Sequence, residues 1–153
     1  MTKQRTRAAM GFVALALGFG GLVASAGSAA ASDPRCTGAT SYWTGPIHDT
    51  YIYMPSGPNA YSCGMSRGEV GEEVRALQDS LNKCYGASLS VDGQFGPRTQ
   101  AALRSAEASH GMTSSLGTYD SRDAVAFRFW GWYLDQNGNQ RWRCGRQDGP
   151  VFD

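Results

Sequence analysis

The stretch V-D-G-Q-F-G-P-R-T, residues 91–99, decides how the middle of the chain folds. Asp92 and Gly93 form a pair typical of a turn, and Pro97 suits the first position of a helix because its φ angle is already fixed. Glycines on both sides of Phe95 let the backbone turn there. The stretch therefore predicts a loop that places Phe95 in the core, under the start of a helix.

Helices are predicted on both sides of this loop. Before it, apolar residues recur at spacings of three and four over residues 71–85, with charged residues between them. After it, an alanine-rich run extends from Pro97 towards Ser109, and Gly111 is a good terminator.

A weaker copy of the loop and its helix follows 24 residues later. It pairs Gly93 with Gly117 and Phe95 with Tyr119, so Tyr119 is also expected in the core. The copy predicts a third helix from about residue 121 to residue 132.

The first 31 residues have the features of a secretory signal peptide: a cationic start, a glycine-interrupted apolar run and small residues before Ala31. The alternative is a retained membrane anchor, which a broken apolar run suits poorly. We expect cleavage after Ala31 and no membrane association afterwards. Cleavage would turn the formal net charge of +1 slightly negative. Because the arginines are also scattered, nucleic acid is not expected as a partner.

All four cysteines lie beyond the expected cleavage site, and an even number in an exported chain indicates disulfides. Three connectivities are possible. We favour Cys36 with Cys63 and Cys84 with Cys144, which would connect the N-terminal segment to itself and the first helix to the tail.

The two ends of the exported chain are rich in aromatic residues. Residues 32–67 contain two alternating runs, T-S-Y-W-T and T-Y-I-Y-M, around G-P-I-H-D, which indicate a hairpin. Residues 133–153 form a tail with an Asn-Gly turn. Trp132 and Trp142 either form a stacking platform for saccharide or pack on the N-terminal aromatic residues as a second small core.

Residues 68–132 resemble the peptidoglycan-binding domain of bacterial cell-wall hydrolases, a three-helix module with an internal loop-helix repeat. The resemblance implies a mainly α fold, a three-helix bundle, to which residues 32–67 add a disulfide-stapled β or irregular segment. The residues that match the family pattern are Gly71, Val74, Leu77, Gln78, Leu81, Asp92, Gly93, Phe95, Gly96, Thr99, Ala102, Leu103, Gly111 and Met112.

Two departures from the family pattern fall in the second half of the repeat. Ala106-Glu107 stands where the family has F-Q, and Leu116-Gly117 stands where it has a second D-G. Such modules also serve as pro-segments or interaction domains, so the resemblance implies the fold more strongly than the ligand.

The predicted ligand contacts lie at the junction of loop and helix and in the tail. Asp92 and Gln94 flank a turn, and Arg98 enters a helix whose N-terminal amides favour an anion such as a stem-peptide carboxylate. The alternative for Arg98 is a solvated side chain lying over the helix. Trp132 and Trp142 complete the predicted set, for a glycan or a stem peptide.

No catalytic centre, metal site or cofactor is predicted. His48 and His110 are the only histidines, and the chain has no C-x-x-C pair, so a zinc hydrolase lacks its ligands. The glutamates fall on expected solvated helix faces rather than in a facing pair. In S-H-G-M, residues 109–112, Met112 stands where an L,D-transpeptidase has its nucleophilic cysteine, and a thioether cannot attack an acyl carbon.

The sequence thus predicts a secreted, extracellular or wall-associated protein that binds peptidoglycan without cleaving it. One alternative is a secreted protein-binding module, an inhibitor or partner of a cell-wall hydrolase. The other is a hydrolase with an unrecognised active site.

Overall fold

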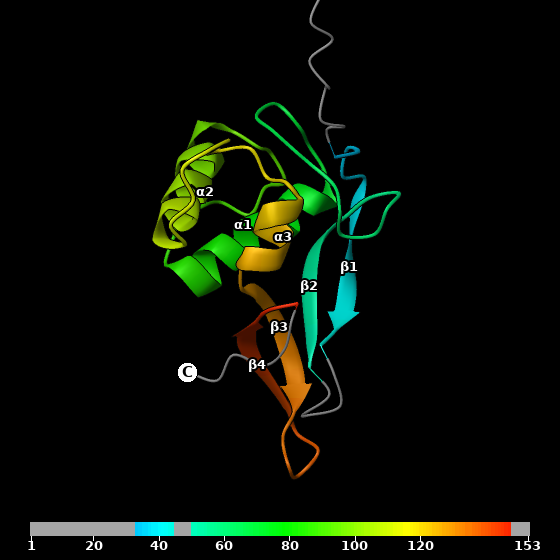
Figure 1. Cartoon of the computed structure of the whole chain (residues 1–153). Coiled ribbons are helices and arrows are strands. Elements are labelled where there is room, and N and C mark those ends of the chain that lie inside the picture. The colour runs from blue at the N-terminus through cyan, green and yellow to red at the C-terminus, as the bar shows by residue number, and fades with distance from the viewer. Residues whose placement is uncertain (1–32, 45–49, 148–153) are drawn as a thin grey trace, which may run out of the picture. The chain divides into compact units, whose positions relative to one another are not determined.

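The computed structural model describes residues 33–44 and 50–147. The predicted signal peptide lies outside them. Along the chain the elements are β1 (Gly38–Trp43), β2 (Tyr51–Ser56), α1 (Glu72–Tyr85), α2 (Pro97–Ser109), α3 (Ser121–Ala126), β3 (Phe129–Leu134) and β4 (Gln140–Gly145), shown in Figure 1. None of the helices in the described ranges has the length and apolar character needed to cross a membrane.

The first two helices form where the sequence predicts them. In α1 the apolar residues Val74, Leu77 and Leu81 are fully buried, and two glutamates occupy the first turn, where they suit the helix dipole. Gly86 ends this helix with a left-handed φ of 70°. The second helix begins at Pro97, the first-turn proline of the opening stretch.

The predicted mainly α, three-helix architecture is wrong. The structure is mixed α and β, with three helices and a four-stranded antiparallel sheet. The third helix ends at Ala126 instead of reaching residue 132, and β3 follows it across the boundary expected between the domain and its tail. Residues 129–134 are rich in aromatic side chains, which favour strands, and they pair with β2, far away in the sequence.

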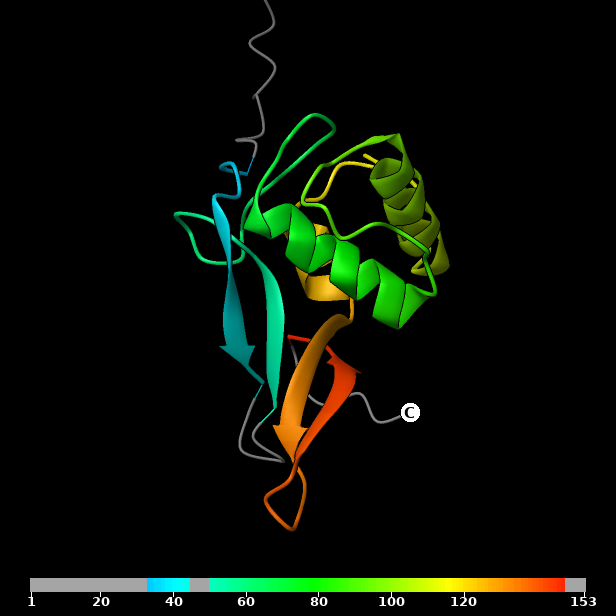
Figure 2. The ribbon, with the colours of Figure 1, turned by 180° about the vertical axis from the view of Figure 1, so that it is seen from behind.

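The sheet has the order β1, β2, β3, β4. The predicted N-terminal hairpin is present as β1 and β2, and the C-terminal hairpin joins it through only two residue pairs, Tyr51 with Trp132 and Ile52 with Gly131. Beyond them α1 takes the place of a strand partner, because the Trp130 amide donates to Ser80 Oγ at 3.1 Å. Figure 2 shows α1 crossing the end of the sheet at which β3 begins.

The core lies between the sheet and the helices. Phe95 and Tyr119 are 1% and 0% exposed, which confirms their predicted place in the core. The disulfides join Cys36 to Cys63 and Cys84 to Cys144, the favoured pairs, and the second ties the end of α1 to β4.

Candidate functional site

The loop before α2 is held from beneath by one buried amide side chain, that of Gln78 on α1. Its Nε2 donates to Asp92 Oδ1 at 2.9 Å, to the Gln94 carbonyl at 3.0 Å and to Thr99 Oγ1 at 3.1 Å. Its Oε1 accepts from the Gly93 amide at 2.9 Å. Because every polar atom of this side chain is bound, Gln78 fixes the loop to the helix.

The tip of the loop needs glycine. Gly93 has a φ of 74°, and a Cβ there would lie 3.0 Å from the Gly71 carbonyl oxygen. Asp92 Oδ1 also accepts from the Gln94 amide at 2.9 Å. These hydrogen bonds, the one from Gln78 foremost, lower the pKa of Asp92, so the carboxylate is ionised at neutral pH.

A cleft of about 450 Å³ opens above this loop, with Gln78 at its base. The structure brings Asp92, Gln94 and Arg98 together on its lining, as the sequence predicts. Arg98 is exposed, and within residues 33–44 and 50–147 its guanidinium makes no hydrogen bond or ion pair. A cation in the first turn of a helix opposes the helix dipole, so neither a salt bridge nor the dipole accounts for an arginine here.

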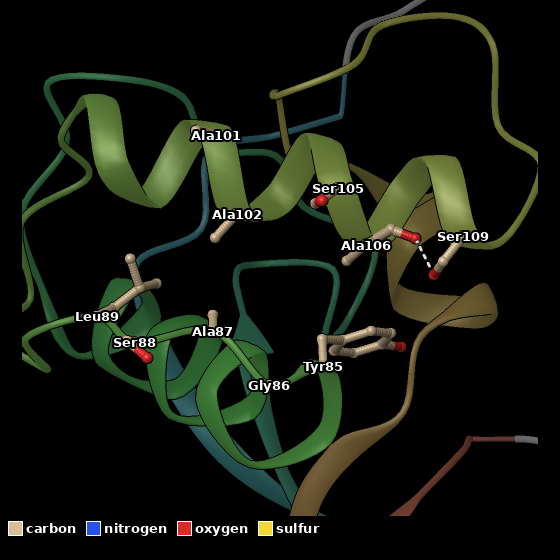
Figure 3. Close-up of a pocket in the computed structure, with 10 residues that line it drawn as sticks. All are labelled: Tyr85, Gly86, Ala87, Ser88, Leu89, Ala101, Ala102, Ser105, Ala106 and Ser109. Carbon is tan, nitrogen blue, oxygen red and sulfur yellow. Dashed lines mark hydrogen bonds between the residues drawn. The ribbon is translucent and has the colours of Figure 1, made fainter.

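A second cleft, of about 470 Å³, adjoins the first at Leu89, which lines both. It lies between the end of α1 and α2, and no charged residue lines it. Figure 3 shows Tyr85, Ala87 and Leu89 facing Ala102 and Ala106 across it. Together the two clefts offer one charged compartment and one neutral compartment along α2.

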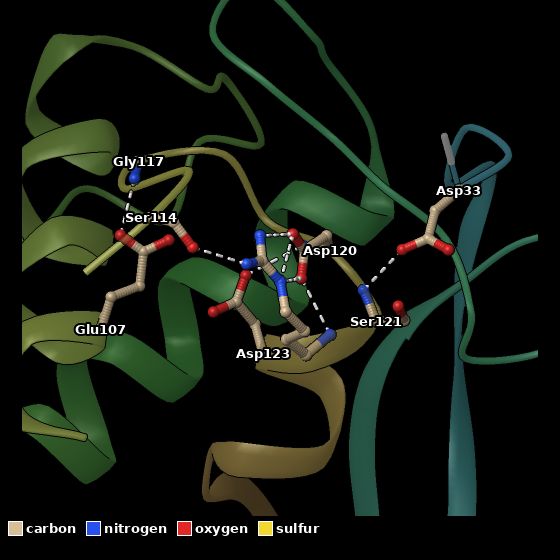
Figure 4. Close-up of polar contacts among 8 residues, drawn as sticks. Asp33, Glu107, Ser114, Gly117, Asp120, Ser121 and Asp123 are labelled. Carbon is tan, nitrogen blue, oxygen red and sulfur yellow. Dashed lines mark hydrogen bonds and ion pairs between the residues drawn. The ribbon is translucent and has the colours of Figure 1, made fainter. Parts of the chain in front are cut away.

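The second half of the repeat reproduces the first by different chemistry. Glu107 Oε2 accepts from the Gly117 amide at 2.6 Å (Figure 4), as the Gln78 side chain accepts from Gly93. Gly117 has a φ of 83°. The two departures from the family pattern therefore keep the loop, although burial raises the pKa of Glu107.

The arginine of the second half is not available to a ligand in the way that Arg98 is. Arg122 Nε binds both carboxylate oxygens of Asp120, at 3.1 and 3.0 Å, and its Nη1 donates to Ser114 Oγ at 2.9 Å. Asp120 in turn caps α3. Arg122 is therefore part of the structure of the second loop.

The other two predicted contacts lie on the sheet, away from the clefts' lining residues. Trp132 stacks on Tyr51, with ring centroids 4.5 Å apart, so one of its faces is covered. Trp142 is 57% exposed and stacks on Trp130 at 5.9 Å. Trp142 thus remains open to solvent, while Trp132 packs with an N-terminal aromatic residue, as the alternative prediction has it.

Sequence reasoning missed the roles of Gln78 and Glu107. The signal for Gln78 was its position on the apolar side of α1. A buried polar side chain needs hydrogen-bond partners, and the neighbouring loop supplies them. Among the described residues, no cluster of three or more His, Cys, Asp or Glu could hold a metal ion.

Comparison with known proteins identifies a family for part of the chain. Residues 70–121 match the family described as "Putative peptidoglycan binding domain", which confirms the resemblance and gives the chain a peptidoglycan-binding domain over that segment. The match covers α1, the loop before α2 and α2 itself, the elements that form the two clefts.

One curated relative is the zinc D-Ala-D-Ala carboxypeptidase of Streptomyces albus G, which is 32% identical over 87 residues. The aligned part is 56% of this chain and 31% of the relative, so the chain spans about a third of that enzyme. No solved structure matches the chain significantly. A cell-wall-binding domain and two disulfides are features of an extracellular protein.

Proposed function

We propose that this protein binds peptidoglycan non-covalently, without cleaving it, through the two clefts along α2. The observation that carries the proposal is Arg98. It is a cation with no partner in the described part of the chain, placed at the mouth of a cleft that a buried hydrogen-bond network holds rigid.

The ligand that fits the charged cleft is a stem peptide. Arg98 and the N-terminal amides of α2 both attract a carboxylate. Asp92, ionised at neutral pH, can accept from an amine on the same peptide. A pocket that carries both signs within one cleft suits a peptide with a free carboxylate and a free amine better than it suits an uncharged sugar.

The neutral cleft beyond Leu89 extends the same surface. Its walls are small alanine and serine side chains with Tyr85 at one end, which leave room for methyl groups and for backbone amides. Alanine residues of a stem peptide would fit there, since little more than their methyl groups needs to be buried.

The proposal that the protein does not cleave its ligand rests on the character of these clefts. Asp92 is the one acid on the lining of the charged cleft and its Oδ1 already accepts two hydrogen bonds, and the neutral cleft is lined by no acid and no histidine. Neither cleft pairs a nucleophile with a general base, as hydrolysis requires.

Both parts of the proposal are tested by incubating the full exported chain with purified, labelled sacculi. We expect the protein to sediment with the insoluble material and the label to stay in the pellet. Protein that remains in the supernatant would contradict binding, and release of labelled fragments would contradict the absence of cleavage.

The alternative function, a protein-binding module that partners a cell-wall hydrolase, is favoured by a different observation. Trp43 and Trp142 are 47% and 57% exposed on the sheet, outside the family match, and exposed tryptophans are common at protein interfaces. If Trp142→Ala abolishes binding to a purified hydrolase while the parent fails to bind sacculi, the alternative replaces the proposal.

A further inference from the structure

A third cavity lies at the junction of three segments far apart in the sequence. Its volume is about 360 Å³. It is formed by β1 with the loop after β2, by α3 and by Gln147, which follows β4. Most of it lies outside residues 70–121, so the peptidoglycan-binding domain match does not account for it. The lining residues are Tyr42, Asn59, Ala60, Tyr61, Ser62, Ser121, Ala124, Val125 and Gln147.

The loop that forms one wall is held in place on several sides. The Gly57 amide donates to the Ala60 carbonyl at 2.7 Å, and the Ser62 amide donates to the Asn59 carbonyl at 3.2 Å. Ala60 has a left-handed φ of 56°, an uncommon conformation for a residue with a side chain. The disulfide at Cys63 fixes the end of the loop. The wall is therefore preformed, which lowers the entropic cost of binding.

The opposite wall is clamped as well. The first amide of α3, that of Ser121, donates to Asp33 Oδ2 at 2.7 Å (Figure 4). This bond joins the N-terminal segment to the helix that carries Ala124 and Val125. Val125 is 53% exposed and lines the cavity, so an apolar group of a ligand has a surface to cover.

The chemistry of the lining selects the ligand class. No lining residue is charged, so a ligand with a carboxylate or an amine would lose its hydration without gaining a partner. The two tyrosines meet edge to face, with centroids 4.7 Å apart. Within the described residues, the side chains of Asn59 and Ser62 make no hydrogen bond. Aromatic rings beside free amide and hydroxyl groups suit a neutral, hydroxyl-rich ring.

We propose that this cavity binds an N-acetylhexosamine residue of a glycan strand. An acetamido group matches both parts of the lining, because its amide can pair with Asn59 or Gln147 while its methyl covers the exposed side chain of Val125. The inference goes beyond the stem-peptide site and does not depend on it. On a polymeric wall the two sites would act together and strengthen binding through a high effective concentration.

The experiment uses the soluble trisaccharide of β-1,4-linked N-acetylglucosamine, titrated into the exported chain and followed by amide chemical shifts. We expect saturable shifts at residues 59–62, 121–125 and 147. The glucose trimer of the same linkage, which lacks the acetamido group, should cause shifts that do not saturate over the same range. Equal responses to the two sugars, or no saturable shift at these residues, would overturn the proposal.

Two variants sharpen the test. Asn59→Asp adds a charge to an exposed position with almost no change of shape, so the protein should fold and its Kd for the trisaccharide should rise by about tenfold or more. Arg98→Ala should leave that Kd unchanged, which separates this site from the stem-peptide site. Unchanged affinity in Asn59→Asp would contradict the assignment, whatever the sacculus assay shows.

Discussion

Glu107 accepts a hydrogen bond from the buried amide of Gly117 at 2.6 Å, and it does so in the position that Gln78 occupies relative to Gly93. A carboxylate and a carboxamide thus perform the same task in the two halves of one repeat. The two side chains differ in the cost of burial. Burying a carboxylate destabilises the fold unless the group is protonated or well hydrogen-bonded.

This relationship predicts that two substitutions of Glu107 differ in their effect on stability. Glu107→Ala leaves the Gly117 amide buried without an acceptor and should lower the free energy of unfolding by about 1 to 3 kcal/mol. Glu107→Gln keeps the acceptor and removes the buried carboxylate, so the free energy of unfolding at pH 7 should change little. Urea denaturation of both variants checks the prediction, and a glutamine variant as unstable as the alanine variant would refute it.

The buried carboxyl of Asp123 makes stability depend on pH. Burial raises its pKa from 3.8 to about 7. Between these two pKa values the folded state holds a proton that the unfolded state releases. The stabilisation that Asp123 contributes is therefore fully present below about pH 4 and is lost as the pH rises through 7. Asp92 has its pKa lowered, chiefly by the bond from Gln78, so its opposite effect falls below pH 3.8. Within the range of Asp123, burial raises the pKa of Glu107, which adds to the loss of stability, and burial lowers the pKa of His110, which offsets part of it.

We therefore expect the free energy of unfolding to fall between pH 4.5 and pH 7.5, by on the order of 2 to 4 kcal/mol. Asp123→Asn keeps an acceptor for the Asp120 amide, which now bonds to Oδ2 at 2.8 Å, and should flatten the dependence. Asp79→Asn, on α1, serves as the control and should keep the slope of the parent. A parent stability that rises over this range would show that the Asp123 interpretation is wrong.

The side chain of Gln78 should stabilise the fold more than that of a glutamine with fewer hydrogen bonds. Gln78→Ala removes a buried side chain that makes four hydrogen bonds to the loop and should lower the free energy of unfolding by about 2 to 4 kcal/mol. Gln100 makes one bond, to the Gly117 carbonyl at 3.3 Å, and Gln100→Ala should cost less than about 1 kcal/mol. Equal losses, measured by urea denaturation, would mean that Gln78 does not hold the loop.

The central helices and their loop could be predicted from the sequence because their signals are local. Pro97 marks a helix start, and the period of residues 71–85 marks a buried face. Local signals also identified Phe95 and Tyr119 as core residues. The sequence also predicted that Asp92, Gln94 and Arg98 lie close together, because they belong to one loop and the first turn of the helix after it.

The sheet could not be predicted in the same way, because it depends on pairing between residues about 80 positions apart, such as Tyr51 and Trp132. A local signal for the C-terminal hairpin did exist: Asn137-Gly138 lies between β3 and β4, in a run rich in aromatic residues. The helical interpretation of residues 127–132 overrode it. The third cavity was beyond prediction, since its walls come from three distant segments.

The most direct measurement is the affinity for purified sacculi of the parent, Arg98→Ala and a matched control. Arg67 is exposed in the loop before α1, lines none of the three cavities and, in the described part of the chain, has no hydrogen bond or ion pair. Arg67→Ala therefore removes the same charge elsewhere. All three proteins should melt at the same temperature.

If Arg98 binds a stem-peptide carboxylate, Arg98→Ala should lose about 1.5 to 3 kcal/mol of binding free energy, which is about tenfold to a hundredfold in Kd. Arg67→Ala should bind as the parent does. Equal affinity of Arg98→Ala and Arg67→Ala would contradict the assignment of the binding site to the clefts along α2.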